Sequence, residues 1–187
     1  TTVLKEIEAL GGAVIDCDAV YHEMLESDRA LQESLERAFG PLRDGQGAID
    51  RKKLGALVFG DPAKLERLNA IAQRAVVQRT RQMVKENRSR GIGLTAIDAF
   101  ALLESGLADL CTTTVAVLAP AEARVARIMA RDGIPEEYAR LRVRAQKDEA
   151  FYRARCTDVL VNDCGSAAAL SEKARQALET ILKEERA

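Results

Sequence analysis

Apolar residues along the chain follow two patterns, helical stripes and short runs rich in β-branched residues. The spacing of Val3, Ile7 and Leu10 predicts a helix over 1–10 that ends at Gly11. Amphipathic stretches predict further helical segments over 19–39, 51–59, 62–89, 120–154 and 166–185. Short apolar runs predict strands over 12–18, 92–98, 113–118 and 159–161.

Strands that alternate with helices predict an α/β fold built on a parallel sheet. The block 19–90, which lies between the first two predicted strands, is unusually helical. We interpret it as an inserted helical subdomain. A chain of 187 residues is long enough to bury a substantial core, and one domain is the expected organisation.

Two acidic residues, Asp16 and Asp18, stand at the end of the first predicted strand. Ligands of open α/β sheets bind at the carboxyl ends of the strands, so this position favours a functional role. A solvated turn or the N-cap of the next helix is the alternative interpretation for either acid.

Composition narrows the possible chemistry. The formal net charge of −1 argues against a dedicated nucleic-acid binder, and no run of about 18 apolar residues predicts a membrane span. The four cysteines show no C-x-x-C spacing and the one histidine is His22, which argues against a Cys/His zinc site and a Ser-His-Asp triad. We therefore expect a cytoplasmic protein without nucleic-acid or membrane partners. Catalysis would depend on carboxylates, Lys/Arg and a cation.

Short motifs occur in order along nearly the whole chain. They begin with Thr1-Thr2-Val3 and continue with the acidic strand end Val14-Ile15-Asp16-Cys17-Asp18. The remaining motifs lie at 44–59, 98–106, 127–133, 142–146 and 157–166. Each motif alone is weakly specific, but the ordered set resembles the dephospho-CoA kinase family of P-loop kinases.

This resemblance implies a three-layer P-loop kinase fold and one kinase domain over 1–187. Its core would comprise about 1–18, 91–119 and 156–187, with an acceptor-binding helical insertion at about 19–90 and a lid at about 120–155. The implied reaction transfers the γ-phosphate of ATP to the 3′-hydroxyl of dephospho-CoA, the last step of coenzyme A biosynthesis. The sequence predicts no oligomeric state.

The resemblance also implies roles for individual residues around the acceptor. Asp18 would accept the proton of the attacking hydroxyl or orient it, and Asp16 would be a supporting catalytic acid. Leu102 and Glu104 would contact the acceptor together with Asp18. His22 is interpreted as structural or as a surface residue.

The residues that the resemblance assigns to ATP are spread along the chain. They are Thr1, Thr2, Arg127, Arg131, Arg142, Asn162 and Gly165. Thr1 would also be a ligand of Mg²⁺ at the start of its helix. The three arginines would bind phosphate oxygens from a helical hairpin, while Arg124 and Arg144 are interpreted as bystanders.

Three departures from the family pattern leave alternatives open. The phosphate loop and its lysine would precede Thr1, so we expect the natural protein to extend upstream by about fifteen residues and the 187-residue chain alone to be inactive. Gln73-Arg74 replaces a His-Pro pair, and Phe100-Ala101-Leu102 replaces Pro-Leu-Leu. A related nucleoside or nucleotide kinase with another acceptor, or a non-catalytic nucleotide-binding remnant, are the alternatives.

Overall fold

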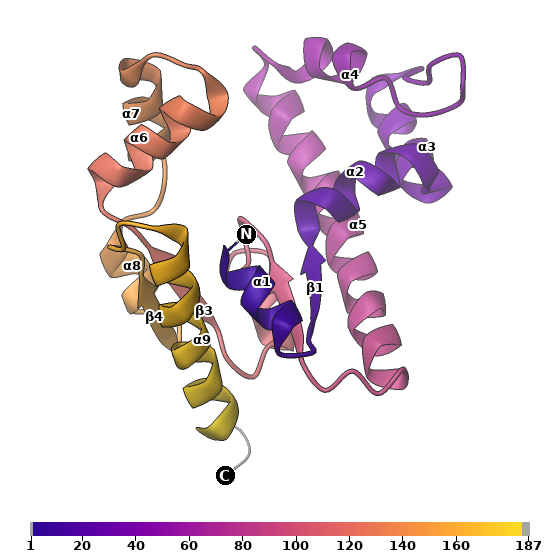
Figure 1. Ribbon diagram of the computed structural model, residues 1–187. Coiled ribbons are helices and arrows are strands. Elements are labelled where there is room, and N and C mark those ends of the chain that lie inside the picture. Colours follow the sequence, from indigo (N-terminus) through magenta and orange to yellow (C-terminus); the bar gives the residue numbers. More distant parts are fainter. Residues whose placement is uncertain (1, 185–187) are drawn as a thin grey trace. The chain divides into compact units, whose positions relative to one another are not determined.

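The computed structural model describes residues 2–184, and the chain divides into two compact units. We call Gly11–Leu110 the middle unit, and Thr1–Leu10 together with Cys111–Ala187 the terminal unit. Helices and strands, labelled in Figure 1, alternate along the chain as the sequence predicts. The expected single domain with a core, an insertion and a lid stays a prediction.

The middle unit contains a parallel pair of strands with helices between them in the chain. Strand β1 (Ala13–Asp16) pairs with β2 (Thr95–Asp98), in a register that sets Asp16 opposite Asp98. Between them lie α2 (Cys17–Ser27), α3 (Arg29–Phe39), α4 (Arg51–Val58) and α5 (Pro62–Ser89), and a short 3₁₀ turn, η1 (Ala108–Leu110), ends the unit. The helices predicted within 19–90 are therefore present.

The single helix predicted over 19–39 is wrong, because the chain breaks at Asp28. The Asp28 backbone is extended (φ −88°, ψ 102°), and its N–H donates to the Met24 carbonyl at the end of α2. Its carboxylate oxygen Oδ1 accepts the Leu31 N–H at 2.9 Å and caps α3. One residue thus ends one helix and begins the next, and each helix can turn its own apolar side to the core.

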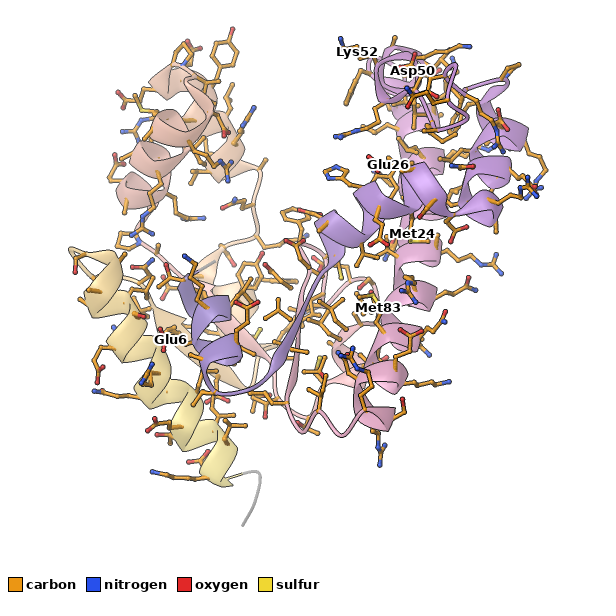
Figure 2. All side chains as sticks on the ribbon, turned by 45° about the vertical axis from the view of Figure 1, so that its right-hand side comes forward. Glu6, Met24, Glu26, Asp50, Lys52 and Met83 are labelled. Carbon is orange, nitrogen blue, oxygen red and sulfur yellow. The ribbon has the colours of Figure 1, made fainter. Side chains whose placement is uncertain are left out.

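The core of the middle unit is apolar and draws on β1, the helices and the loop between α3 and α4. Its buried members are Ile15, Val20, Met24, Leu25, Leu31, Leu35, Leu42, Ile49, Leu54 and Val58. Helix α5 adds partly buried side chains, among them Met83, labelled with Met24 in Figure 2. The fully buried Thr80 of α5 contacts Cys17 at the start of α2, with 3.6 Å between Oγ1 and Sγ. Helix α5 is thereby fixed beside the carboxyl end of β1.

The terminal unit contains a second parallel pair, β3 (Val115–Leu118) with β4 (Asp158–Val161). Between these strands the chain forms α6 (Ala121–Asp132), α7 (Glu136–Arg144) and α8 (Glu149–Arg153). Helix α1 (Thr2–Ala9) packs along α9 (Ala167–Glu184), as the indigo and yellow helices of Figure 1 show. The core here is small: Leu160, Leu170 and Ala174, with Val3 and other half-buried residues against them.

The predicted α/β class with parallel strands is confirmed by both strand pairs. Each observed strand is four residues long, shorter than the runs predicted at 12–18, 92–98 and 113–118. Within residues 2–184, no helix combines the length and apolar character needed to cross a membrane.

Candidate active site

Three carboxylates gather at the carboxyl ends of β1 and β2. Asp16 is the last residue of β1 and lies opposite Asp98, the last residue of β2. The strand predicted to continue to Asp18 ends at Asp16, and Asp18 lies in the first turn of α2. All three side chains are exposed to solvent, at the edge of the strand pair where ligands of α/β proteins bind.

The first two acids differ in what they bind. Asp16 is the N-cap of α2, and its Oδ1 accepts the N–H groups of Asp18 and Ala19, each at 3.0 Å. The N-cap alternative is therefore correct for Asp16. The Asp18 carboxylate has no hydrogen-bond or ion-pair partner within residues 2–184. Both of its carboxylate oxygens are available to a substrate.

Asp98 is the acid that sequence reasoning missed as a site residue. Although its side chain remains accessible to water, partial desolvation raises the pKa of its carboxyl, and the negative charges of Asp16 and Asp18 raise this pKa further. The sequence signal was available, because Ile97-Asp98 ends its strand just as Ile15-Asp16 does.

The segment after β2 carries the predicted acceptor residues Leu102 and Glu104. It is built of consecutive turns, in which the Leu102 carbonyl accepts the Ser105 hydroxyl at 3.2 Å and the Ala108 N–H at 3.2 Å. Leu102 is half-buried and Glu104 is exposed. No contact between either side chain and Asp18 is observed in the described residues, so their role stays a prediction.

An open groove of about 710 Å³ lies on the helices of the middle unit. It is lined by Tyr21, His22, Leu25, Arg51, Lys52, Leu54, Gly55, Ala56, Val58, Phe59 and Leu68. Among these residues the charged ones are cations, and an Arg51 Nη2 lies 3.1 Å from Nε2 of His22. Burial raises the pKa of Tyr21, against the opposing effect of the Arg51 charge. The groove thus combines apolar walls with a cationic and aromatic rim.

The predicted lid, residues 120–155, contains the expected helical hairpin. Helix α6 follows Pro120 and ends at Gly133, whose left-handed backbone (φ 64°) suits glycine, and α7 follows Pro135 and packs against α6. Arg131 and Arg142 both donate to the Asp132 carboxylate, the former through Nε at 2.6 Å. The structure therefore brings these two arginines together on one carboxylate.

Arg127 lies apart from that pair. Its Nη2 donates to Oδ1 of Asn162 at 3.3 Å, immediately after β4. The loop that follows is held by Lys173 of α9, whose Nζ donates to the Val161 carbonyl at 2.7 Å and to Asp163 at 2.8 Å. Gly165 is exposed in the same loop. The structure therefore brings Arg127 and Asn162 together at the end of β4, and Gly165 follows Asn162 by three residues in the chain.

Arg124, interpreted as a bystander of ATP binding, is held within the hairpin, and its role stays a prediction. Its Nη1 donates to Oε1 of Gln146 at 2.6 Å, and its Nε is buried without a hydrogen-bond partner in the described residues. Gln146 lies just beyond the end of α7.

The start of α1 is the last predicted nucleotide contact. Thr2 begins the helix, and Thr1 lies outside the residues that the structure describes.

Comparisons with known proteins decide the family. The family model described as dephospho-CoA kinase matches residues 1–168. A dephospho-CoA kinase of Thermobifida fusca is 31% identical over 182 residues, which cover 97% of this chain and 90% of that protein. Its counterpart from Corynebacterium diphtheriae is 32% identical over 177 residues, 94% of this chain and 88% of that protein. The chain belongs to the dephospho-CoA kinase family.

Solved structures show the same fold. A crystal structure of a Thermus thermophilus protein superposes with a TM-score of 0.72 at 34% sequence identity, covering 98% of this chain and 90% of that one. The dephospho-CoA kinase of Campylobacter jejuni, at 21% identity, has the same TM-score of 0.72 and shares the fold. The predicted kinase family and its P-loop kinase fold are confirmed.

Three residues that depart from the family pattern lie on exposed surface. Gln73 and Arg74 are exposed on α5, and Phe100 is 82% exposed in the turn after β2. No group of three or more His, Cys, Asp or Glu among the described residues is arranged to hold a metal ion. Kinases bind Mg²⁺ through one or two carboxylates together with substrate phosphates and water. The carboxylates at the ends of β1 and β2 are of the type and number that this coordination needs.

Proposed function

We propose that this protein transfers the γ-phosphate of ATP to the ribose 3′-hydroxyl of dephospho-CoA, with Asp18 as the general base. The observation that carries the proposal is the free carboxylate of Asp18, at the ligand-binding edge of a member of the dephospho-CoA kinase family. As the hydroxyl oxygen bonds to the γ-phosphorus, its proton passes to Asp18, and the bond between phosphorus and the bridging oxygen breaks to release ADP.

Asp16 and Asp98 support this step without taking the proton. The hydrogen bonds that Asp16 accepts from the N–H groups of Asp18 and Ala19 fix the first turn of α2, and so the direction of the Asp18 side chain. Asp98 lies opposite Asp16 at the same strand ends and adds a second carboxylate to this edge. Mg²⁺ that accompanies ATP neutralises phosphate charge when it is bound there.

We assign the groove of the middle unit to the acceptor. Dephospho-CoA joins a pyrophosphate to a long, mostly aliphatic arm. The cations on the rim, Arg51 and Lys52, suit the pyrophosphate, since guanidinium groups bind phosphate oxygens in a bidentate manner. Apolar walls such as Leu54 and Phe59 suit the arm. Leu102 and Glu104 are proposed to contact the acceptor closer to Asp18.

For ATP, we propose three groups of contacts in the terminal unit. Arg131 and Arg142 would exchange Asp132 for phosphate oxygens, and Thr1 and Thr2 would meet phosphate and Mg²⁺ at the start of α1, where the helix dipole favours anions. The adenine would lie along the β4 edge, near Asn162 and Gly165. A cytoplasmic location is also proposed, supported by the four cysteines, which form no disulfide in the described residues.

An acceptor screen with Asp18 variants tests the proposal. We expect the full-length protein, but not the 187-residue chain alone, to phosphorylate dephospho-CoA with ATP and Mg²⁺ in preference to nucleosides and nucleotides. Asp18→Asn should lower turnover by about 10²–10⁴-fold, because an amide of the same shape cannot take the proton. Glu26→Gln on the same helix is the matched control and should have no effect.

Two outcomes would contradict these assignments. Preferred phosphorylation of a nucleoside would favour the alternative acceptor that Gln73-Arg74 and Phe100 leave open. Nearly full turnover by Asp18→Asn, with loss of turnover in Asp16→Asn, would show that Asp16 is the base.

A further inference from the structure

Glu6 of α1 is a buried carboxylate that the proposed chemistry does not use. Its side chain lies between α1 and α9, where Figure 2 labels it, and the residue is only 7% exposed. One oxygen accepts the hydroxyl of Ser171, and the other accepts Nε of Arg175 at 3.0 Å. These two hydrogen bonds lower the pKa of Glu6, with that from Ser171 having the larger effect. Among residues 2–184, no other carboxylate side chain is buried.

The partners of Glu6 form one edge of the contact between the two helices. On α1, Val3, Glu6 and Ile7 are spaced three and four residues apart and share a face. On α9, Ser171 and Arg175 form one row of that spacing beside the buried row Leu170, Ala174 and Leu178. Val3 packs on the apolar row, while Glu6 binds the polar row.

A helix as short as α1 needs a tertiary contact to fix its direction. It has eight residues, fewer than an isolated helix needs to be stable in water. Apolar contacts hold it against α9, but they are not directional, so they permit α1 to roll or slide. Two hydrogen bonds to opposite oxygens of one carboxylate fix both the rotation of α1 and its position along α9.

We propose that Glu6 is a positioning residue for the nucleotide: through Ser171 and Arg175 it fixes α1 on α9 and so places the N-terminus of α1. The inference rests on the proposed role of Thr2 and the start of α1 in binding ATP. Glu6 itself lies more than a helical turn from that end and touches no reacting atom. Its effect is on where the backbone N–H groups of the first turn point.

The test separates positioning from simple stabilisation. Glu6→Leu removes the acceptor of both hydrogen bonds, and because losing one partner of a buried ion pair is destabilising, we expect its unfolding temperature to fall. The kinetic constants are therefore measured well below that temperature, where every variant is folded. The KM of Glu6→Leu for ATP should rise roughly tenfold, since small misplacements of binding groups have large effects, while its KM for dephospho-CoA stays within about twofold. Glu8→Leu, on the exposed side of α1, is the matched control and should change neither constant.

Variants on α9 keep the test decisive if Glu6→Leu fails to fold. Ser171→Ala and Arg175→Ala each remove one donor and should raise KM for ATP in the same selective way. The amide oxygen of Glu6→Gln still accepts one hydrogen bond, so its KM for ATP should rise less than that of Glu6→Leu. Wild-type KM for ATP in all of these variants, or an equal rise of both KM values, would overturn the proposal.

Failure of the proposed function would look different. A wild-type protein that binds ATP in a calorimetric titration but leaves dephospho-CoA unphosphorylated contradicts the proposed function alone. The same titration with Glu6→Leu and Glu8→Leu then decides the role of Glu6 by ATP affinity.

Discussion

Two strand pairs of this protein have the same topology but connect their strands in different ways. In the middle unit, helices α2–α5 join β1 to β2 and bury a large apolar cluster. In the terminal unit, helices α6–α8 join β3 to β4, and only two residues of these helices are buried, Val125 and Ala139. Charged pairs hold this second segment instead, among them Arg140 with Glu122 and Glu136.

This difference indicates which connection can move. A segment held by close-packed apolar side chains has one arrangement, because any displacement opens cavities. A segment held by exposed ion pairs can exchange its partners for those of a ligand at little loss, since such pairs add little stability. The middle unit thus suits a fixed acceptor site, and the α6–α8 segment suits a lid that closes on a triphosphate.

The largest expected effect on stability comes from truncating a buried side chain in the apolar cluster of the middle unit. Leu35 of α3 is fully buried in the cluster, so Leu35→Ala should lower the free energy of unfolding by about 2–5 kcal/mol. Leu141→Ala on α7, where the side chain is 52% exposed, should change it by less than about 0.5 kcal/mol. Urea titration of both variants measures the difference, and equal effects would remove the basis of the comparison.

The next effect concerns the arginines that we expect to close over ATP. Arg131→Ala and Arg142→Ala should each reduce kcat/KM for ATP by roughly 10–100-fold, since hydrogen bonds to charged groups contribute about 1.5–3 kcal/mol. The KM for dephospho-CoA should change little. Arg144→Ala is the control, because Arg144 is exposed on the same helix as Arg142. Equally small effects of all three substitutions would show that these arginines form only a solvated surface.

Much of this architecture could be predicted from the sequence. Helices α4 and α5 begin and end within a residue of their predicted bounds, because Asp50 and Asp61 are N-caps and Pro62 starts α5. The ordered motifs led to the right family even though each is short. Asp18 could be singled out because it stands beside a strand end, but the commitment of Asp16 to an N-cap required the observed hydrogen bonds.

Other features depend on contacts between distant residues. From the sequence alone, Glu6 would be predicted to be a solvated residue of a helix. Its burial depends on hydrogen bonds from Ser171 and Arg175, near the other end of the chain. The Arg124–Gln146 and Arg127–Asn162 pairs also join residues far apart in sequence. In the middle unit, the helix predicted over 19–39 was wrong because apolar periodicity continues through Asp28 and hides the cap there.

Loss of the Asp28 cap should have a smaller effect on the stability of helices α2–α5, which join β1 to β2. Asp28→Ala removes the acceptor for the Leu31 N–H and should lower the free energy of unfolding by about 0.5–2 kcal/mol. Asp28→Asn keeps a capping oxygen and should retain most of the stability. Thermal unfolding distinguishes the two substitutions. A loss in Asp28→Asn as large as in Asp28→Ala would show that capping is not what Asp28 contributes.

The smallest expected effect is a pH-dependent change in the stability of helices α6 and α7, which lie in the segment between β3 and β4. Hydrogen bonds from Arg140 lower the pKa of Glu122, as the 2.7 Å distance between Nη2 and Oε2 leads one to expect. The folded pKa is therefore below the unfolded value of about 4.3. The pair stabilises α6 and α7 at neutral pH, and this contribution is lost as pH falls from about 4.3 through the lowered folded pKa.

Amide hydrogen exchange can detect this change segment by segment. Protection of α6 and α7 should hold between pH 7 and pH 5 and fall at more acidic pH, before protection of α2–α5 does, because the apolar cluster does not titrate. Glu122→Gln should weaken protection of α6 and α7 already at pH 7 and reduce its further loss in acid. Some loss of protection in acid should remain in Glu122→Gln, because Asp132 also titrates there and a hydrogen bond from Arg131 lowers its pKa. If Glu122→Gln loses protection in acid as steeply as the wild type, then the Arg140 pair does not hold the two helices together.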